Sequence, residues 1–296
     1  MKRIVQCYFP IEKFRGFGEF LASTMSLHDF CSKRSIEVFV SYAKHDLIQS
    51  LMVNTVPVDI PIEEIPVIQS LSDLESLIND ETKDTAYICF YYSTLLTYDK
   101  RPLFEESIQF VKEQCLNVTK EVLERVEEVR SVFECNKHEY VCLHVRVGDG
   151  DLVHKIGMYK PLFENIIKNI DSIVKPELQY STVVVVSDSD IFKTLLQKVY
   201  SNMHVSSATP AHLGIHGSVH RQHILDTIVD FFLLAHSSKI IIISSHHQHP
   251  LVASYFSKVA SFLYDVPVII QKIHLEIYRD KCDDRSAGSA SIAKHE

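Results

Sequence analysis

The sequence predicts an α/β protein built from two parallel sheets with helices on both faces. Segments of strand character alternate with segments of helical apolar spacing along almost the whole chain. The runs V-V-V-V at 183–186 and I-I-I-I at 240–243 show no polar alternation, which is typical of parallel strands covered on both faces. With 296 residues, the chain is long enough for two such domains.

The first half begins with a short apolar strand that Pro10 ends. A stretch with three prolines is expected to be extended or loop-like. A later stretch combines helical apolar spacing with many Glu and Lys residues, which predicts one or two amphipathic helices. In chain order we expect a strand at 3–9, a helix at 17–34, a strand at 37–42, a short helix at 46–52, the loop-like stretch at 53–67, a helix at 72–78, a strand at 85–92 and the amphipathic helices within 104–133.

The second half repeats the alternation from residue 140 onwards. We expect strands at 140–145, 182–186, 203–206, 239–244 and 266–270, and helices at 159–170, 190–199, 222–235 and 250–262. These elements divide the chain into an N-terminal domain at 1–136 and a C-terminal domain at 137–281. The remaining residues, 282–296, have low hydrophobicity and are expected to form a disordered tail.

Composition limits the kinds of partner. The formal net charge is −8, so the surface has no general attraction for nucleic acid or an anionic membrane. The longest apolar candidate for a membrane span, 224–245, is interrupted by charged side chains, and the first apolar run is too short for a signal sequence. Seven scattered cysteines without a C-x-x-C pair favour a reducing compartment. We therefore expect a cytoplasmic protein without a transmembrane segment.

The first candidate site lies in the run H-V-R-V-G-D-G-D at 144–151, directly after a strand. His144 and Arg146 are two positions apart, so they project from one face of the strand. Glycines after them allow a sharp turn, and a guanidinium at a strand end suits a phosphate because it is permanently charged and can bond two oxygens. An ion pair between Arg146 and Asp149 explains the same residues equally well.

Two other strand ends carry polar residues. The run S-D-S-D at 187–190, which includes Asp188, closes V-V-V-V, and Ser244 and Ser245 close I-I-I-I. Ligands of open α/β sheets bind at the carboxyl ends of strands, and a helix start offers N–H groups to an anion without a metal. Capping of the next helix is the alternative at both places, and in the first run it leaves some residues unexplained.

A glycine-rich run, R-G-F-G-E-F at 15–20, lies between the first strand and the first helix. Gly16 and Gly18 form a lone G-x-G that lacks the third glycine of the dinucleotide fingerprint, which argues against an NAD-dependent oxidoreductase. The two glycines still permit a ligand to approach the start of the helix closely.

In their order and spacing, these motifs resemble those of the GDP-fucose-dependent fucosyltransferases. H-V-R-V-G-D is similar to the H-x-R-(R)-(G/T)-D motif shared by α1,2-, α1,6- and protein O-fucosyltransferases. V-V-V-V-S-D-S-D is similar to their second motif, and the helix with Asp226 and Asp230 followed by I-I-I-I-S-S is similar to their third. R-G-F-G-E-F-L resembles the glycine-rich start of the family's acceptor-side domain.

The resemblance implies a GT-B fold, in which two Rossmann-like domains face a central cleft. It also implies inverting sugar transfer that needs no metal or other cofactor. The domain at 1–136 would face the acceptor, and the domain at 137–281 would bind the nucleotide sugar. The partners would be a nucleotide sugar, in this family GDP-fucose, and a glycan or glycolipid acceptor that the sequence does not identify. A cytoplasmic member of this family would be of bacterial or viral type, because the eukaryotic relatives are secretory.

The resemblance also implies roles for the phosphate-facing residues. Arg146 would neutralise the donor pyrophosphate and assist its departure, and His144 would touch the nucleoside or the phosphates. Asp188 would line the nucleoside pocket. Gly16 and Gly18 would border the donor.

Further donor contacts follow from the third motif. Asp230, or in its place Asp226, would accept from the guanine N–H groups, and Ser244 and Ser245 would bond the β-phosphate side. Many relatives carry a second Arg where this chain has Val147. With one cation fewer, another nucleotide sugar such as a UDP-sugar remains an alternative donor.

Inverting transfer needs a base for the proton of the acceptor hydroxyl. Glu19 would face the cleft if the glycine loop is placed as in the family, and Asp149 and Asp151 are alternatives. Glu19 can instead serve only the first turn of its helix. A chain that kept the donor site and lost the base would be a nucleotide-sugar or glycan-binding module without activity.

Histidines offer a rival reading as a metal hydrolase. The residues are His212, His216, His220, His223, His246, His247 and His249. The first three are spaced by four, which places ligands together only on a continuous helix, and Gly214 and Gly217 interrupt this one. No H-E-x-x-H motif is present, so we expect no metal site.

Overall fold

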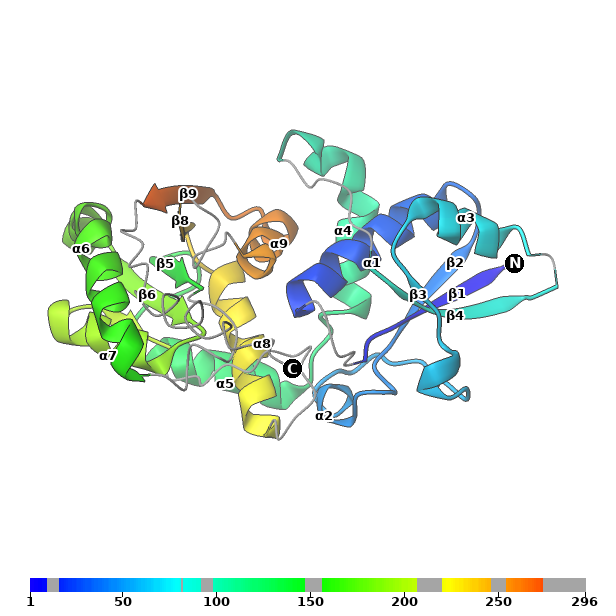
Figure 1. Cartoon of the computed structure of the whole chain (residues 1–296), viewed down its shortest axis with the longest axis horizontal. Coiled ribbons are helices and arrows are strands. Elements are labelled where there is room, and N and C mark those ends of the chain that lie inside the picture. Colours follow the sequence, from blue (N-terminus) through cyan, green and yellow to red (C-terminus); the bar gives the residue numbers. More distant parts are fainter. Residues whose placement is uncertain are drawn as a thin grey trace, which may run out of the picture.

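A computed structural model describes residues 1–9, 16–80, 82–91, 98–146, 156–206, 220–245 and 254–273. It contains a four-stranded and a five-stranded sheet, and every strand pair in both is parallel. The two sheets lie beside each other, with helices between them and around them (Figure 1). The α/β class predicted from the alternating segments is confirmed.

The first sheet has the order β2-β1-β4-β3. Its strands are β1 (Arg3–Cys7), β2 (Glu37–Ser41), β3 (Val67–Ile68) and β4 (Thr85–Phe90). The accompanying helices are α1 (Phe17–Ser32), the short α2 (Asp46–Gln49) and η1 (Ile62–Glu64), then α3 (Leu71–Ile78), η2 (Tyr98–Phe104) and α4 (Glu105–Gln114).

The two faces of the first sheet are covered differently. On one face, Ile4 and Ile88 pack with Leu27 of α1 and Leu74 of α3. The other face, which includes Val5, Cys7 and Cys89, is covered by Val58 and Ile65. These two residues belong to the proline-containing stretch at 53–67, so this segment, in which η1 is a single short 3-10 turn, takes the place of a covering α-helix.

The second sheet has the order β7-β6-β5-β8-β9. Its strands are β5 (Tyr140–Val145), β6 (Thr182–Ser187), β7 (His204–Val205), β8 (Lys239–Ser245) and β9 (Val268–Ile273). The helices around it are α6 (Ile156–Tyr180), α7 (Asp190–Val199), α8 (Arg221–Ala235) and α9 (Tyr255–Tyr264).

Alternate residues of these strands enter two separate cores. Leu143, Val185 and Ile241 pack with Ile170 of α6 and Phe192 of α7. Their neighbours Cys142, Val184 and Ile242 enter the other core, together with side chains of α8 and α9. Helices therefore cover both faces of the second sheet, as the runs without polar alternation predicted.

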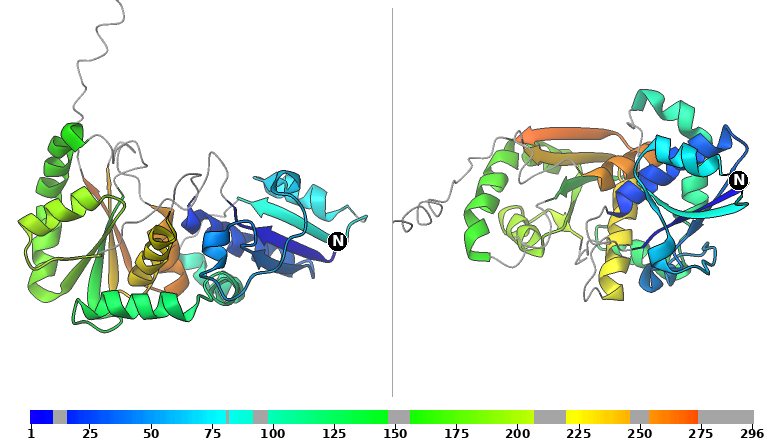
Figure 2. Two further views of the ribbon diagram at one scale, coloured as in Figure 1. Left: turned by 90° about the horizontal axis from the view of Figure 1, so that it is seen from below. Right: turned by 45° about the vertical axis from the view of Figure 1, so that its right-hand side comes forward.

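The helix α5 (Lys120–Ser131) joins the two halves and packs against α8 (Figures 1 and 2). Arg221 at the start of α8 binds both carboxylate oxygens of Glu121, at 2.6 and 2.5 Å, and donates to the Ser50 hydroxyl at 3.1 Å. The fold thus associates α5 with the second sheet. The division of the chain at 136/137 stays a prediction.

The helix α6 is longer than predicted. The sequence predicted its end at residue 170, whereas the structure continues the helix through Pro176 to Tyr180. A proline within a helix leaves the carbonyl four residues earlier without its partner. Pro176 and Ser172 are both exposed, so water can bond that carbonyl and the helix is not interrupted.

Candidate functional site

The structure places three of the predicted site residues in a row at the carboxyl edge of the second sheet. Val145 is in register with Ser187 of β6 on one side and with Ile243 of β8 on the other. Arg146, Asp188 and Ser244 each follow one residue later. Because neighbouring strands lie about 4.8 Å apart, three residues from three separate motifs occupy adjacent positions.

His144 is a buried, neutral side chain. It is 5% exposed, and its Nδ1 lies 2.8 Å from the hydroxyl oxygen of Ser257 on α9. Burial, with the charge of Arg146 as the smaller cause, lowers the pKa of His144 to about 3. The effect of Arg146 reflects the proximity of the two residues, and their placement on one face of the strand stays a prediction.

Helix capping explains part of the second motif. The Ser189 hydroxyl accepts from the amide of Phe192 at 3.2 Å and caps α7, and the Ser187 hydroxyl accepts from the amide of Ser189 at 3.3 Å. Asp188 lies between these two serines and is half-buried. The capping alternative is therefore correct for Ser189, and Asp188 is the residue of the motif at the edge of the site.

The two acidic residues of α8 are both buried. Asp226 is 5% exposed and accepts from the side-chain amide of Gln222 at 2.9 Å. Asp230 is 1% exposed, and its Oδ1 accepts from the Ser206 hydroxyl at 2.5 Å. Contact of either carboxylate with a guanine stays a prediction, since neither is open to a ligand in this conformation.

Asp230 has an unusual electrostatic environment. Its Oδ2 is buried and has no hydrogen-bond partner within the described part of the chain. Burial raises the pKa of Asp230 to about 7, although the charge of Lys193 and the bond from Ser206 act in the opposite direction.

Gly18 marks the contact between the two halves of the molecule. A Cβ at this position would lie 2.5 Å from Cα of Phe256 and 3.0 Å from the carbonyl carbon of Tyr255. The first turn of α1 therefore lies against the first turn of α9, as Figures 1 and 2 also show. Gly18 therefore permits the close approach of another helix. From the sequence we expected the close approach of a ligand at this position. Gly16, with φ −69° and ψ 173°, precedes α1 and has no side chain to cap it.

This helix contact places the starts of α1 and α9 together, next to the strand that carries Arg146. His144, two residues before Arg146, bonds Ser257 in the first turn of α9. The first turn of a helix presents unpaired N–H groups and a partial positive charge. Two such ends and one guanidinium place positive charge here, beside the carboxylates of Glu19 and Asp188.

Glu19 lies in the first turn of α1 and is half-buried. Its charge contributes to the raised pKa values of Tyr8 and Tyr91, whose main cause is burial. These tyrosines follow the carboxyl ends of β1 and β4, so Glu19 lies at the carboxyl edge of the first sheet. The structure thereby places the predicted base at the junction of the two halves, on the helix turn that contacts α9.

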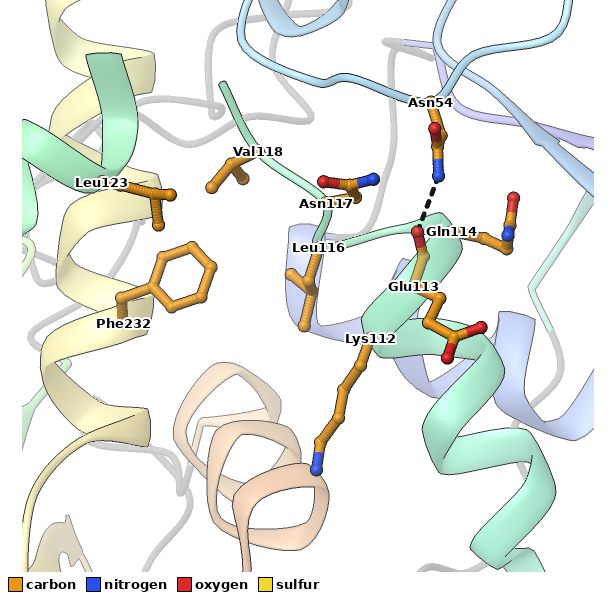
Figure 3. Close-up of a pocket in the computed structure, with 9 residues that line it drawn as sticks. All are labelled: Asn54, Lys112, Glu113, Gln114, Leu116, Asn117, Val118, Leu123 and Phe232. Atoms are coloured by element: carbon orange, nitrogen blue, oxygen red, sulfur yellow. Dashed lines mark hydrogen bonds between the residues drawn. The ribbon is translucent and has the colours of Figure 1, made fainter. Parts of the chain in front are cut away.

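A pocket of about 520 Å³ lies away from these strand ends (Figure 3). Phe232 and Leu123 line one side, and residues of α4 and the following segment line the other; there the Asn54 amide donates to the Glu113 carbonyl at 2.8 Å. Phe232 belongs to the second half of α8, which leads to the amino end of β8. The pocket therefore faces the edge opposite Arg146 and Ser244, and we do not assign it to the donor.

Some predicted residues lie outside the described part of the chain. They are Val147, Asp149, Asp151, His212, His216, His246, His247 and His249, and the side chain of Ser245 is likewise outside it. In the ranges that the structure describes, no group of three or more His, Cys, Asp or Glu residues could hold a metal ion. No helix within those ranges is long and apolar enough to cross a membrane.

The sequence interpretation missed three residues that support the site. Ser257 positions His144, whereas Lys193 and Ser206 surround Asp230. Lys193 offered one sequence signal, since it lies next to Phe192 and one turn before Leu196, among the apolar positions of α7. Ser206 and Ser257 offered no sequence signal, because serine is an ordinary residue both in loops and at helix starts.

Two parallel sheets that meet beside a strand-end site are the arrangement expected of a GT-B fold. The chain is similar to NodZ α-1,6-fucosyltransferase in a structure soaked with GDP-fucose, at 14% identity and a TM-score of 0.56, and in a structure co-crystallised with GDP, at 13% and 0.53. For fucosyltransferase NodZ from Bradyrhizobium the values are 14% and 0.53. Each comparison covers 91% of this chain and 94% of the NodZ chain.

These similarities confirm the predicted GT-B fold of the fucosyltransferases. In sequence, the chain matches no protein-family model and no curated protein.

Proposed function

We propose that the protein is an inverting, metal-independent glycosyltransferase that transfers fucose from GDP-fucose to a hydroxyl of a glycan or glycolipid. The observation that carries this proposal is the row formed by Arg146, Asp188 and Ser244 beside the joined starts of α1 and α9. The NodZ structures of the same fold were obtained with GDP and with GDP-fucose, which supports a nucleotide sugar as the ligand.

The donor diphosphate is assigned to Arg146 and the helix starts beside it. A guanidinium can bind two phosphate oxygens at once, and the N–H groups of a helix start bind an anion without a metal. Ser244, one strand away, supplies a hydroxyl toward the same ligand. Asp188 on the other side is assigned to the nucleoside, because a carboxylate beside the diphosphate would repel it.

In the reaction, the oxygen of the acceptor hydroxyl forms a bond to the anomeric carbon of the sugar. The bond from that carbon to the diphosphate breaks, and its electron pair remains on the diphosphate oxygen. Arg146 stabilises this developing negative charge, which is the largest electrostatic demand of the step. His144 is neutral at physiological pH, so it adds no second positive charge and serves by position and hydrogen bonding.

Glu19 is proposed as the base that accepts the proton of the acceptor hydroxyl. It lies on the first sheet's side of the α1–α9 contact, opposite the strand that carries Arg146. The base and the cation that stabilises the leaving diphosphate would thus be supplied by different halves of the molecule. Asp149 and Asp151 remain the alternative bases.

A thermal-shift panel of GDP, UDP, CDP, ADP and NAD, run with and without EDTA, tests this proposal. A ligand that binds only the native state raises the melting temperature. We expect a rise with GDP that Arg146→Ala abolishes, whereas Arg3→Ala preserves it. Arg3 is a suitable control because its exposed ion pair with Glu37 lies at the start of β1.

The other outcomes separate the alternatives. A rise with UDP alone would retain the glycosyltransferase and change the donor. Binding of GDP-fucose without hydrolysis or transfer to any glycan in an acceptor screen would identify a binding module without activity. No rise with any nucleotide would overturn the proposal, and a rise that EDTA removes would contradict its metal independence.

A further inference from the structure

The side of the second sheet beside Asp188 contains a buried network of charged and polar groups. Lys193 of α7 is 3% exposed, although lysine is seldom buried without a partner. Its ammonium lies 2.7 Å from Oδ1 of Asp190 and donates to the carbonyl of Ser206 at 3.3 Å. The charge of Lys193 also acts on the buried carboxylate of Asp230.

Ser206 is held by three separate elements. Its amide donates to the carbonyl of Val185 in β6 at 3.0 Å, and its carbonyl accepts from Lys193 of α7. Its hydroxyl donates to Asp230 of α8. The residue that leaves the end of β7 is therefore fixed to a strand and to two helices at once.

The contact with Asp190 alone does not account for Lys193. An ion pair between residues three apart on a helix is ordinary at a surface and contributes little there. Asp190 is itself exposed, with 51% of its side chain accessible, whereas the side chain of Lys193 is 4% accessible. Burial of the ammonium is offset in addition by its bond to the Ser206 carbonyl and by the charge of the Asp230 carboxylate.

The Asp230 carboxylate depends on Lys193 in turn. One of its oxygens accepts from Ser206, and the other is buried without a hydrogen-bond partner in the described ranges. An isolated buried carboxylate is strongly unfavourable. The ammonium of Lys193 is the compensating charge, and without it Asp230 would be a buried carboxylate with no opposite charge to offset its burial.

We propose that Lys193 and Asp230 are positioning residues of the donor site. Together they hold Ser206 and the turn at 187–190 in the arrangement in which Asp188 meets the nucleoside. This inference rests on the proposed function, because it assigns the turn to a nucleotide. Asp230 then acts from behind the binding surface, through Ser206 and Lys193, and touches no ligand.

Lys193→Met tests the proposal, because it removes the ammonium and retains most of the side-chain volume. Lys239→Met is the matched control. Lys239 forms a partly buried ion pair with Glu177 of α6 at 2.6 Å, at the amino end of β8 and hence at the opposite edge of the same sheet. Both variants are expected to lower the melting temperature. Only Lys193→Met should weaken GDP binding by the folded protein, by about tenfold or more.

Hydrogen exchange measured without ligand provides a second readout. In Lys193→Met, exchange should increase in peptides covering 186–193 and 203–206, and in Lys239→Met it should not. If Lys193→Met leaves too little folded protein, the double variant K193M/D230N replaces it. This variant removes both buried charges, since the Asp190 carboxylate that remains is exposed, and it carries the same two expectations.

The outcomes distinguish this proposal from the proposed function. Unchanged GDP affinity and unchanged local exchange in Lys193→Met would overturn the positioning role. Equal weakening of GDP binding by Lys239→Met would also overturn it, since the effect would then follow from general destabilisation. A wild-type protein that binds no nucleotide would overturn both the proposed function and the assignment of this turn to a nucleoside. Hydrogen exchange would then decide only whether Lys193 orders the strand ends.

Discussion

Gly18 of α1 lies against Phe256 of α9 so closely that a Cβ at Gly18 would come within 2.5 Å of the Phe256 Cα. Distances under about 3 Å between such carbons are not tolerated, so one helix would have to move. This contact joins the two halves of the molecule at the place where Arg146, Glu19 and both helix starts are found. The geometry of the site thus depends on the absence of a side chain at one position.

Gly18→Ala is expected to destabilise the protein by about 1–3 kcal/mol, the usual cost of overpacking a tight contact. A methyl group would separate the first turns of α1 and α9, because the opposing atoms are backbone. Urea unfolding measures the change. Gly16→Ser is the control, since a serine at the residue before the helix can cap it and should be neutral or slightly stabilising. Equal stability of Gly18→Ala and wild type would contradict the contact.

Arg146→Ala is expected to weaken GDP binding by about 10- to 100-fold, which corresponds to the loss of charge-assisted hydrogen bonds worth roughly 1.5–3 kcal/mol. Arg146→Lys should retain part of the affinity, because a lysine keeps the charge but cannot bind two oxygens in the same geometry. Calorimetric titration measures both variants. Wild-type affinity in Arg146→Ala would show that the diphosphate binds elsewhere.

Glu19→Gln is expected to lower the rate of transfer by about 10²- to 10⁴-fold, the range for a general base, with GDP affinity little changed. The amide keeps the size of the side chain but cannot accept the proton. Transfer from GDP-fucose to an acceptor, followed under saturating donor, measures the effect. A variant with full activity would assign the base to another residue, and Asp149→Asn and Asp151→Asn would then be compared in the same assay.

His144→Gln is expected to reduce the loss of stability in acid. The pKa of His144 is about 3 in the folded protein and about 6.5 when unfolded, so between these values the unfolded state binds more protons. The wild type therefore loses stability as pH falls through this window, by about 2–3 kcal/mol from this residue between pH 7 and pH 4.5. The substituted glutamine would not titrate, although its amide can still bond Ser257.

Urea unfolding of wild type and His144→Gln at several pH values tests this linkage. The difference between the two curves isolates His144, because the pKa of His236, also lowered by burial to about 4, is common to both proteins. The pKa of Asp230 is raised to about 7, so between pH 7 and its unfolded pKa near 3.8 this residue makes the folded protein more stable as pH falls. This contribution is also the same in both proteins and cancels in the difference. Parallel curves would show that His144 is not buried in the neutral form.

Much of the fold could be predicted because its signals are local. The runs 183–186 and 240–243 are apolar at every position. Such a run predicts a parallel strand that is buried on both faces, and the two cores of the second sheet agree with this. The order of the motifs around Arg146, Asp188 and Ser244 also indicated one shared edge, since the carboxyl ends of parallel strands meet there. The register of β5 with β6 and β8 is consistent with that expectation.

Other features depend on partners far away in the sequence. Whether Asp230 faces a ligand or the interior is decided by Ser206 and Lys193, which reach it from β7 and α7. The extension of α6 through Pro176 depends on which side of the helix faces water. Neither the burial of Asp230 nor the extension of α6 can be predicted from neighbouring residues. Apolar periodicity indicates which face of an element is buried, but it does not indicate which residues cover that face.

The sequence by itself determined the class of fold, the strand ends that carry polar residues and the residue types present there. Only the tertiary structure decided that Gly18 makes room for a helix, that His144 is buried against Ser257, and that Asp230 is compensated by Lys193. The physical reason is the range of the interactions. Strand and helix patterns arise from residues a few positions apart, whereas burial, pKa and close packing are set by atoms that folding brings together from distant segments.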